Sequence, residues 1–403
     1  MIRWIIFIVF VLFIDFYAFQ SVKTITKNKY ILLFYWLISF AVLGNVIYQL
    51  TTFNNSKGLT QAVMLAFGLV ILSITPKILA IVVLFSEDIF RIVKSGFNYF
   101  SSKHTGNFFP ERREAVSKIA LGIAAIPFSS VLYGMVKGKY NYQVIKHTLY
   151  FDDLPVAFDG YKLTHISDIH SGSFDNESKI DYGINLINEQ NSDVILFTGD
   201  LVNNTADEMD PWISNFSKLK AKDGKYSVLG NHDYGEYVRF KTPQEKEENF
   251  KAIKDIHPKI GFNLLLNDSV YLEKEIDKIA LIGVENWGTR FKKAGDLNLA
   301  SLKVKKEDFK ILLSHDPSHW NTEVKNHDTK YHLTLSGHTH GMQFGIEIPG
   351  IKWSPVQYVY KQWAGIYKGY GKYLNVNRGF GFLAFPGRVG IWPEITVITL
   401  KKK

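Results

Sequence analysis

The sequence contains no cysteine. Disulfides, thiolate zinc sites and cysteine nucleophiles are therefore excluded, and any metal ion must be held by imidazole, carboxylate, carboxamide or water ligands. The chain also lacks an acidic excess, since 47 Lys and Arg stand against 38 Asp and Glu, a formal charge of +9. A basic chain favours anionic partners such as lipid headgroups or phosphorylated substrates, but charge alone does not choose among them.

Charged residues are scarce in the first third of the chain, where four apolar runs occur. Each is long enough, at about 20 residues or more, to cross a hydrocarbon core of ~30 Å as a helix. The third run contains Pro76 and is interpreted as one kinked crossing. The fourth is rich in Ala, Gly and Ser, and a buried amphipathic helix is its alternative. The predicted spans lie near residues 2–20, 30–50, 59–90 and 117–136, within a membrane anchor of residues 1–145.

Basic residues in the short loops predict the orientation of these spans. Lys23, Lys27 and Lys29 follow the first span, and Arg112 and Arg113 precede the fourth. Because Lys and Arg resist translocation, both loops are predicted to be cytoplasmic. With four crossings, the residues after the last span lie outside the cytoplasm. A third run that crosses twice, or a fourth that does not span, would reverse this.

Residues 146–403 show a different pattern, in which short apolar runs alternate with polar helical stretches. This is typical of a layered α/β domain. Five of the runs end in metal-ligand residue types, and the carboxyl ends of strands are where loops converge on a site. The five segments are Asp168-Ile169-His170, Gly199-Asp200, Gly230-Asn231-His232-Asp233, His315-Asp316 and Gly337-His338-Thr339-His340.

These segments offer carboxylate, carboxamide and imidazole groups in numbers that can hold two divalent ions sharing one Asp. Two such ions bind phosphoryl oxygens, activate a water near neutral pH and neutralise an in-line transition state. The chemistry indicated is phosphoester hydrolysis.

The ordered pattern DxH, GD, GNHD, H and GHxH resembles the calcineurin-like metallophosphoesterases over residues 160–345. The resemblance implies a four-layer αββα sandwich and two divalent ions, which can be Mn²⁺, Fe²⁺/Fe³⁺ or Zn²⁺. It also implies three ligands for the first metal, one bridging ligand and three ligands for the second, namely Asp168, His170 and His340, then Asp200, then Asn231, His315 and His338.

The same resemblance implies the catalytic acid. His232 is expected to contact the phosphate and protonate the leaving oxygen, with Asp233 orienting it. The segments Ser336–Gly341 and Asn375–Gly379 resemble the membrane-associated YkuE/YaeI type of bacterial phosphodiesterase. An integral protein of a bacterial inner or cell membrane is therefore expected, with an extracytoplasmic catalytic domain.

Several tail residues have two interpretations. Arg378 and Arg388 lie in glycine-rich loops, where a guanidinium could clamp a phosphate or serve packing alone. His165 is interpreted as structural. An aromatic cluster could contact lipid, although core packing is the favoured interpretation. The cluster consists of Trp353, Tyr358, Tyr360, Trp363 and Tyr367.

The predicted function is that of a membrane-anchored dimetal phosphoesterase, in particular a phosphodiesterase, acting on phosphorylated lipids or cell-envelope precursors. Its expected partners are membrane lipids and a phosphorylated lipid or small phosphodiester substrate, with no nucleic acid or protein partner. One alternative is a cytoplasm-facing hydrolase of the pyrophosphate in a UDP-diacylglucosamine-type precursor of lipid A. Another is a non-catalytic metal-binding signalling module, and a nuclease is disfavoured because no nucleic-acid module is recognisable.

Overall fold

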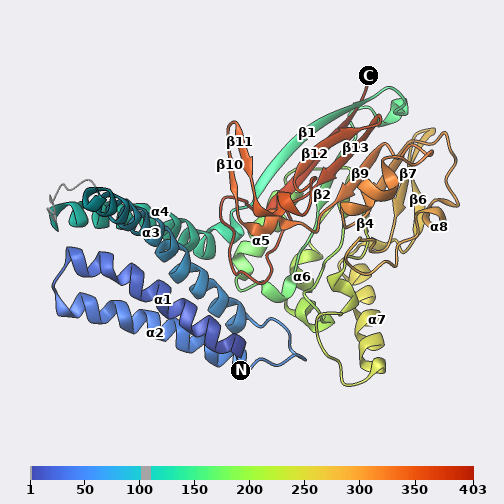
Figure 1. The fold of residues 1–403 in the computed structure, drawn as a ribbon. Coiled ribbons are helices and arrows are strands. Elements are labelled where there is room, and N and C mark those ends of the chain that lie inside the picture. The colour runs from blue at the N-terminus through green and yellow to red at the C-terminus, as the bar shows by residue number, and fades with distance from the viewer. Residues whose placement is uncertain (1, 101–109) are drawn as a thin grey trace. The chain divides into compact units, whose positions relative to one another are not determined.

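The computed structural model describes residues 2–100 and 110–403 (Figure 1). The chain forms two compact units. The helical unit comprises Met1–Phe53 and Gln61–Val136, and the sheet unit comprises Asn54–Thr60 and Lys137–Lys403.

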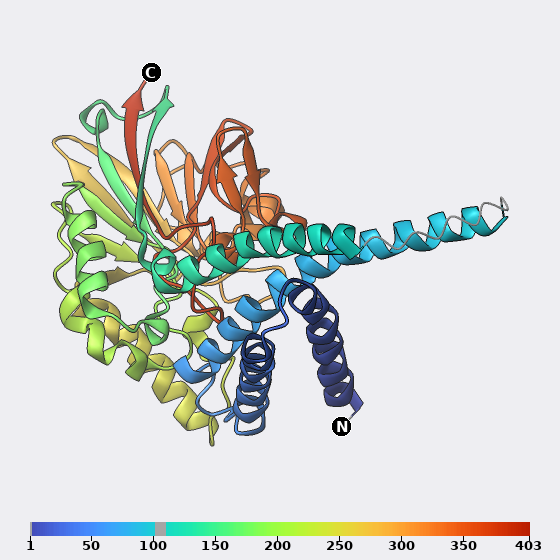
Figure 2. The same cartoon turned by 90° about the vertical axis from the view of Figure 1, so that its left-hand side faces the viewer.

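The helical unit consists, in its described part, of helices long and apolar enough to cross a membrane. At most 28% of the residues in each apolar window are buried, so most of their apolar surface faces outward, as in helices that contact lipid. These features indicate an integral membrane protein. In Figure 2, α3 and α4 run side by side. The helices are α1 (Ile2–Ile25), α2 (Lys29–Thr51), α3 (Gln61–Phe100) and α4 (Pro110–Val136).

Helix α3 continues through Pro76 without a break. Its 40 residues correspond to about 60 Å of helix, which exceeds the thickness of the hydrocarbon core. The third predicted span therefore belongs to a single helix that is longer than predicted.

A group of polar side chains inside the helical unit is paired. Lys77 Nζ lies 2.5 Å from Asp15 Oδ1 and 2.9 Å and 2.7 Å from the hydroxyls of Ser39 and Ser73, which joins α1, α2 and α3. Because an unpaired charge is costly among apolar helices, these contacts select one packing of the three helices.

The sheet unit contains two six-stranded mixed sheets and a two-stranded hairpin. The first sheet has the order β1 (Gln143–Phe151), β14 (Glu394–Lys402), β2 (Lys162–Ile166), β3 (Val194–Phe197), β4 (Lys225–Ser227) and β5 (Asn263–Leu264). The second has the order β12 (Gly365–Gly369), β13 (Lys372–Val376), β9 (Leu333–Ser336), β8 (Lys310–Leu313), β7 (Asp277–Gly283) and β6 (Asp268–Lys274). The hairpin pairs β10 (Ile346–Ile348) with β11 (Ile351–Trp353).

Alternation of side chains along the strands explains the layers. In β3, Val194 and Leu196 point into a core shared with β8 and β9 of the second sheet, while Ile195 and Phe197 point toward helices. The outer face of the first sheet is covered by α5 (Glu177–Asn188) and α7 (Pro243–Lys259). The second is covered by α8 (Leu297–Ser301) and a turn of π-helix. The predicted four-layer αββα sandwich is confirmed.

The start of the sheet unit differs from the predicted boundary. The predicted break between residues 145 and 146 falls inside β1, whose register with β14 already begins at Gln143↔Glu394. A strand cut at this point would lose part of its ladder, so the unit begins earlier, at Lys137.

A short segment between α2 and α3 also belongs to the sheet unit. The backbone N–H of Arg239 donates to the carbonyl of Asn55 at 2.9 Å. Gly58 is buried, with Asn204 and Val238 so close that a Cβ on it would lie 2.9 Å from each. Residues 54–60 are thus packed beside the loop that follows β3.

Candidate metal centre

The predicted ligands converge where the strands end. Asp168 and His170 follow β2, Asp200 follows β3, and His315 follows β8. Within each of two groups the ligand atoms lie within 4.8 Å of one another. The groups are Asp168, His170 and His340, and Asp200, His315 and His338.

In the first group, imidazole and carboxylate atoms face each other directly. His340 Nε2 lies 3.1 Å from Asp168 Oδ1 and 3.0 Å from His170 Nε2. His170 Nδ1 lies 3.1 Å from Asn203 Oδ1. Because Nδ1–H donates to that amide oxygen, the Nε2 lone pair is available to a metal ion.

In the second group, His315 Nε2 lies 3.2 Å from Asp200 Oδ2 and 3.2 Å from His338 Nδ1. The other ring nitrogen of His315 donates to the carbonyl of Thr198 at 2.7 Å. Asp200 Oδ2 also lies 3.5 Å from His170 Nε2 of the first group. One carboxylate therefore stands between the two groups, where a bridging ligand is needed.

Asn231 supplies a test of whether the donors fit a metal. Its side chain is 3% exposed, and Nδ2 donates to the hydroxyl of Tyr237 at 2.8 Å. Among the described residues, Asn231 Oδ1 has no hydrogen-bond partner although it is buried. A buried carbonyl without a partner costs about 1–3 kcal/mol, so a cation at this oxygen would remove a real penalty. The side chains fit two divalent ions.

The backbone at the ligands is bent in an unusual way. Residues other than glycine rarely adopt a positive φ, because Cβ then crowds the carbonyl oxygen. This strain, which is typical of functional sites, turns side chains of one loop toward the others. The ligands with positive φ are Asp168 (53°), His170 (49°), Asp200 (60°), His338 (68°) and His340 (50°).

The motif glycines make room for the carboxylates. A Cβ on Gly230 would lie 2.2 Å from Asp200 Oδ1, and one on Gly337 would lie 2.2 Å from Asp168 Oδ2. Both distances are far below van der Waals contact. Any side chain at these two positions would displace a ligand, which explains why the turns need glycine.

Opposite charges dominate the electrostatics of the site. Burial raises the pKa of Asp200, but the neighbouring His315 and His232 outweigh it and hold that pKa well below its usual range. Burial lowers the pKa of His315, yet the charge of Asp200 overcomes this and raises it to about 10. The buried carboxylates thus create a place where positive charge is strongly favoured.

Comparison with known proteins identifies the family. The chain matches "Probable Calcineurin-like phosphoesterase, transmembrane domain" over residues 2–139 and "Calcineurin-like phosphoesterase" over residues 161–342. The metallophosphoesterase YkuE of Bacillus subtilis is 32% identical over 263 residues, which cover 64% of this chain and 85% of YkuE. The chain belongs to the calcineurin-like phosphoesterases.

Two further relatives are also metallophosphoesterases by their names. A transmembrane protein with metallophosphoesterase domain from Danio rerio is 26% identical over 313 residues, covering 74% of this chain and 68% of its own. The metallophosphoesterase YkoQ of Bacillus subtilis is 27% identical over 292 residues, which cover 69% of this chain and 97% of YkoQ. The protein is a metallophosphoesterase with a transmembrane domain and buried metal-ligand clusters.

His232 lies beside the first group of the phosphoesterase, but the prediction that Asp233 orients it is wrong. His232 Nδ1 lies 2.7 Å from the carbonyl oxygen of Asn203, which holds the ring. The Asp233 carboxylate instead accepts the backbone N–H groups of Asp200 (2.9 Å), Leu201 (2.8 Å) and Gly230 (2.8 Å). Asp233 therefore ties two ligand loops together and does not contact the imidazole that was expected to need it.

The sequence analysis did not assign two residues to the phosphoesterase centre, since Asn203 was not named and Tyr360 was placed only in the aromatic cluster. Asn203 serves His170 through its side chain and His232 through its carbonyl. Tyr360 places its hydroxyl 2.9 Å from His338 Nε2, and 3.3 Å from Asp316. Asn203 follows Asp200 by three residues, so its position in a ligand loop was a usable signal. Tyr360 belongs to no motif and carried none.

The guanidinium groups of the two tail arginines are buried and already form contacts within the domain. Arg378 and Arg388 are 4% and 0% exposed. Arg378 forms ion pairs with Glu394 and Glu347, and Arg388 donates to backbone carbonyls, including that of Arg378 at 2.8 Å. These contacts favour the packing alternative. Of the aromatic cluster, Trp363 is buried in the core whereas Tyr358 is 77% exposed.

Proposed function

We propose that this phosphoesterase is a two-metal phosphodiesterase, anchored in a membrane, that hydrolyses phosphorylated lipids or cell-envelope precursors. The observation that carries the proposal is the position of Asp200 between two buried ligand groups, with the His232 imidazole beside them. Mn²⁺, Fe²⁺/Fe³⁺ or Zn²⁺ suits this mixture of imidazole, carboxylate and carboxamide ligands. When bound, such ions supply Lewis-acid stabilisation of the phosphoryl group and activation of the attacking water.

The side chains hold this chemistry in place. Asp168, His170 and His340 would bind the first ion, and Asn231, His315 and His338 the second, with Asp200 shared. The fixed Nδ1–H of His170 and His315 points each Nε2 toward the site. The buried ligands keep the distances between donors constant, so little reorganisation accompanies the reaction.

His232 is proposed as the general acid. Its Nδ1–H donates to the Asn203 carbonyl, which leaves Nε2 to act on the substrate. Burial lowers the pKa of His232, and a bound phosphate anion would raise that pKa again by favouring the imidazolium. The proton on Nε2 is then given to the oxygen of the departing alcohol.

The proposed site faces away from the cytoplasm. Basic residues favour cytoplasmic loops after α1 and before α4. Residues 54–60, between α2 and α3, pack within the sheet unit, which supports placing this loop and residues 137–403 on the same face. Only an even number of crossings between them is compatible with this, as when α3 and α4 each cross once. A protease-protection assay would test it, and a cytoplasmic site would favour the nucleotide-linked lipid substrate instead.

The catalytic proposal is tested with the full chain in detergent. We expect hydrolysis of bis-p-nitrophenyl phosphate with Mn²⁺ and none with EDTA, and slower hydrolysis of p-nitrophenyl phosphate. His232→Ala should lower the rate by about 10²–10⁴-fold, the usual contribution of a positioned acid. His327→Ala, which changes a histidine outside both ligand groups, is the matched control. Equal rates for the two variants would refute the role of His232, and metal-independent turnover would refute the two-metal mechanism.

A further inference from the structure

The β10–β11 hairpin has two faces of opposite character. Its cross-strand pairs are Ile346↔Trp353, Glu347↔Lys352 and Ile348↔Ile351. Because paired residues and residues two apart share one side of a hairpin, the charged pair forms one face and the apolar pairs form the other.

The charged face is turned toward the rest of the sheet unit. Glu347 Oε1 lies 2.5 Å from Nη2 of the buried Arg378, and Lys352 Nζ donates to the carbonyl of Ala364 at 2.6 Å. Both charges are thus used to hold the hairpin to the domain.

The apolar face is turned outward. Ile346, Ile348 and Ile351 are 49%, 55% and 53% exposed. An antiparallel hairpin on a water-soluble domain has the opposite arrangement, with its apolar face packed and its polar face in solvent. The exposed surface continues into the next turn, where Tyr358 is 77% and Val359 47% exposed. We call this surface the apolar hairpin patch, and it consists of Ile346, Ile348, Ile351, Trp353, Tyr358 and Val359.

The position of the patch connects it with the metal centre. The chain leaves the centre at His340, enters β10 six residues later, and returns at Tyr360, whose hydroxyl lies 2.9 Å from His338. Both ends of the patch segment are therefore fixed to residues of the centre. The segment that carries the patch therefore begins and ends beside residues of the centre.

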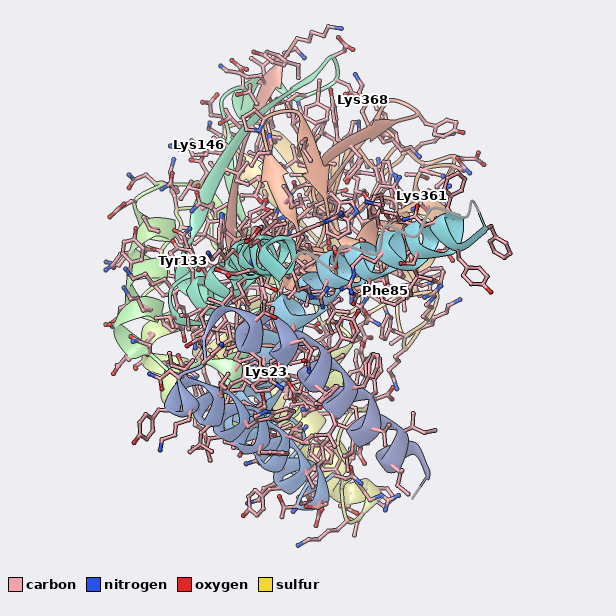
Figure 3. All side chains as sticks on the ribbon, turned by 60° about the vertical axis from the view of Figure 1, so that its left-hand side comes forward. Lys23, Phe85, Tyr133, Lys146, Lys361 and Lys368 are labelled. Atoms are coloured by element: carbon pink, nitrogen blue, oxygen red, sulfur yellow. The ribbon has the colours of Figure 1, made fainter. Side chains whose placement is uncertain are left out.

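The composition of the patch fits a lipid bilayer. Trp353 Nε1 lies 3.4 Å from the Tyr358 hydroxyl, and such amphipathic aromatic side chains are enriched at membrane interfaces. Lys361 and Lys368, labelled in Figure 3, follow the patch and are exposed, so positive charge is available for anionic headgroups. The same chain carries the apolar helices that bring it to a membrane.

We infer that the apolar hairpin patch inserts into the interface of the lipid bilayer and thereby presents lipid-borne phosphate to the metal centre. The inference rests on the proposed function, which it extends by assigning the surface that meets the substrate. Insertion of the three isoleucines removes apolar area from water, and the salt bridge between Glu347 and Arg378 holds the hairpin to the domain.

Direct contact with lipid can be measured because the chain has no cysteine. Ile348→Cys in the full chain is labelled with a polarity-sensitive fluorophore and reconstituted into vesicles of phosphatidylcholine and phosphatidylglycerol. Ile276→Cys is the matched control, since Ile276 is 99% exposed in the turn between β6 and β7. We expect lipids brominated in their acyl chains to quench the label at 348, and iodide to quench only the label at 276.

Two results would overturn the inference. A label at 348 that iodide quenches as well as at 276 would show that the patch stays in water. A label protected from iodide but not quenched by brominated lipid would show that protein, such as a second copy of the chain, covers the patch instead.

Activity separates this inference from the proposed function. Ile348→Glu should hydrolyse bis-p-nitrophenyl phosphate as the unaltered chain does. It should hydrolyse phosphatidyl-p-nitrophenol in vesicles about tenfold more slowly, because one of the isoleucines that insert into the bilayer is lost. Ile276→Glu should change neither rate. Equal loss on both substrates would contradict a docking role. Failure of the unaltered chain on both would instead refute the proposed function, while the quenching result still reports on lipid contact.

Discussion

Removal of the Asn203 side chain should weaken metal binding without impairing the catalytic acid. In Asn203→Ala, the Nδ1–H of the fully buried His170 loses its acceptor at 3.1 Å. A buried donor left unpaired costs about 1–3 kcal/mol, which corresponds to roughly 5- to 150-fold in affinity. Substitution of the residue that hydrogen-bonds a metal-binding histidine usually lowers metal affinity by about 10–100-fold, which falls in the same range.

The maximal rate should be much less affected. His232 is held by the backbone carbonyl of Asn203, which alanine retains. We therefore expect the half-saturating Mn²⁺ concentration for hydrolysis of bis-p-nitrophenyl phosphate to rise by about 10–100-fold, with the rate recovering at saturating metal. The assay uses chelator-buffered Mn²⁺ and the full chain stripped of metal.

Asn204→Ala is the matched control. Asn204 is the adjacent residue and is likewise buried, at 4% exposed, but its side chain contacts Gly58 rather than a metal ligand. The same metal dependence in both variants would refute the reasoning. So would a lower maximal rate for Asn203→Ala with no shift in metal dependence, because the side chain would then act on catalysis directly.

Three other perturbations have distinct expected results. Tyr360→Phe removes the hydroxyl beside His338 Nε2, so affinity for one of two metal ions should fall by about tenfold, measured by calorimetric titration. Burial lowers the pKa of His257 to about 3. Since its unfolded pKa is about 6.5, the unfolded chain binds a proton that the folded chain does not, and stability falls as pH drops between these values by roughly 1.4 kcal/mol per unit. His257→Gln should remove this contribution from the pH dependence of thermal unfolding, and an unchanged pH dependence would contradict this account. Lys77→Met should destabilise the chain in detergent by about 3–5 kcal/mol, because Asp15 is left buried without its partner, and adding Asp15→Leu should restore stability.

Much of the centre was predictable because strand and turn chemistry are local. Short, almost wholly buried apolar runs ended just before Asp168, Asp200 and His315, and glycines marked several of the turns. The structure brings these ends to one place because parallel strands β2, β3 and β8, β9 all direct their carboxyl ends to the loops of the site. The apolar helices were equally visible, since length and composition alone define a possible span.

The remainder depended on tertiary contacts that no local pattern encodes. Asp233 was adjacent to His232 in sequence, yet the bend of the chain directs its carboxylate to backbone N–H groups of another loop. Tyr360 reaches His338 from a segment with no motif. Arg378 occupied a glycine-rich loop that suggested phosphate binding, whereas Glu347 and Glu394 already neutralise it.

The pairing of β1 with β14 has a consequence for biosynthesis. β14 follows every other strand of the two sheets in the chain, yet it lies between β1 and β2. The first sheet therefore cannot close during translation until the residues of β14 are available, and its most distant pairing is also a slow one to form. Until then the ligand loops after β2 and β3 have no completed sheet beneath them. A chain interrupted before β14 would still have its membrane helices but would lack a complete first sheet. Because the ligand loops depend on that sheet, we expect such a truncated chain to be inactive.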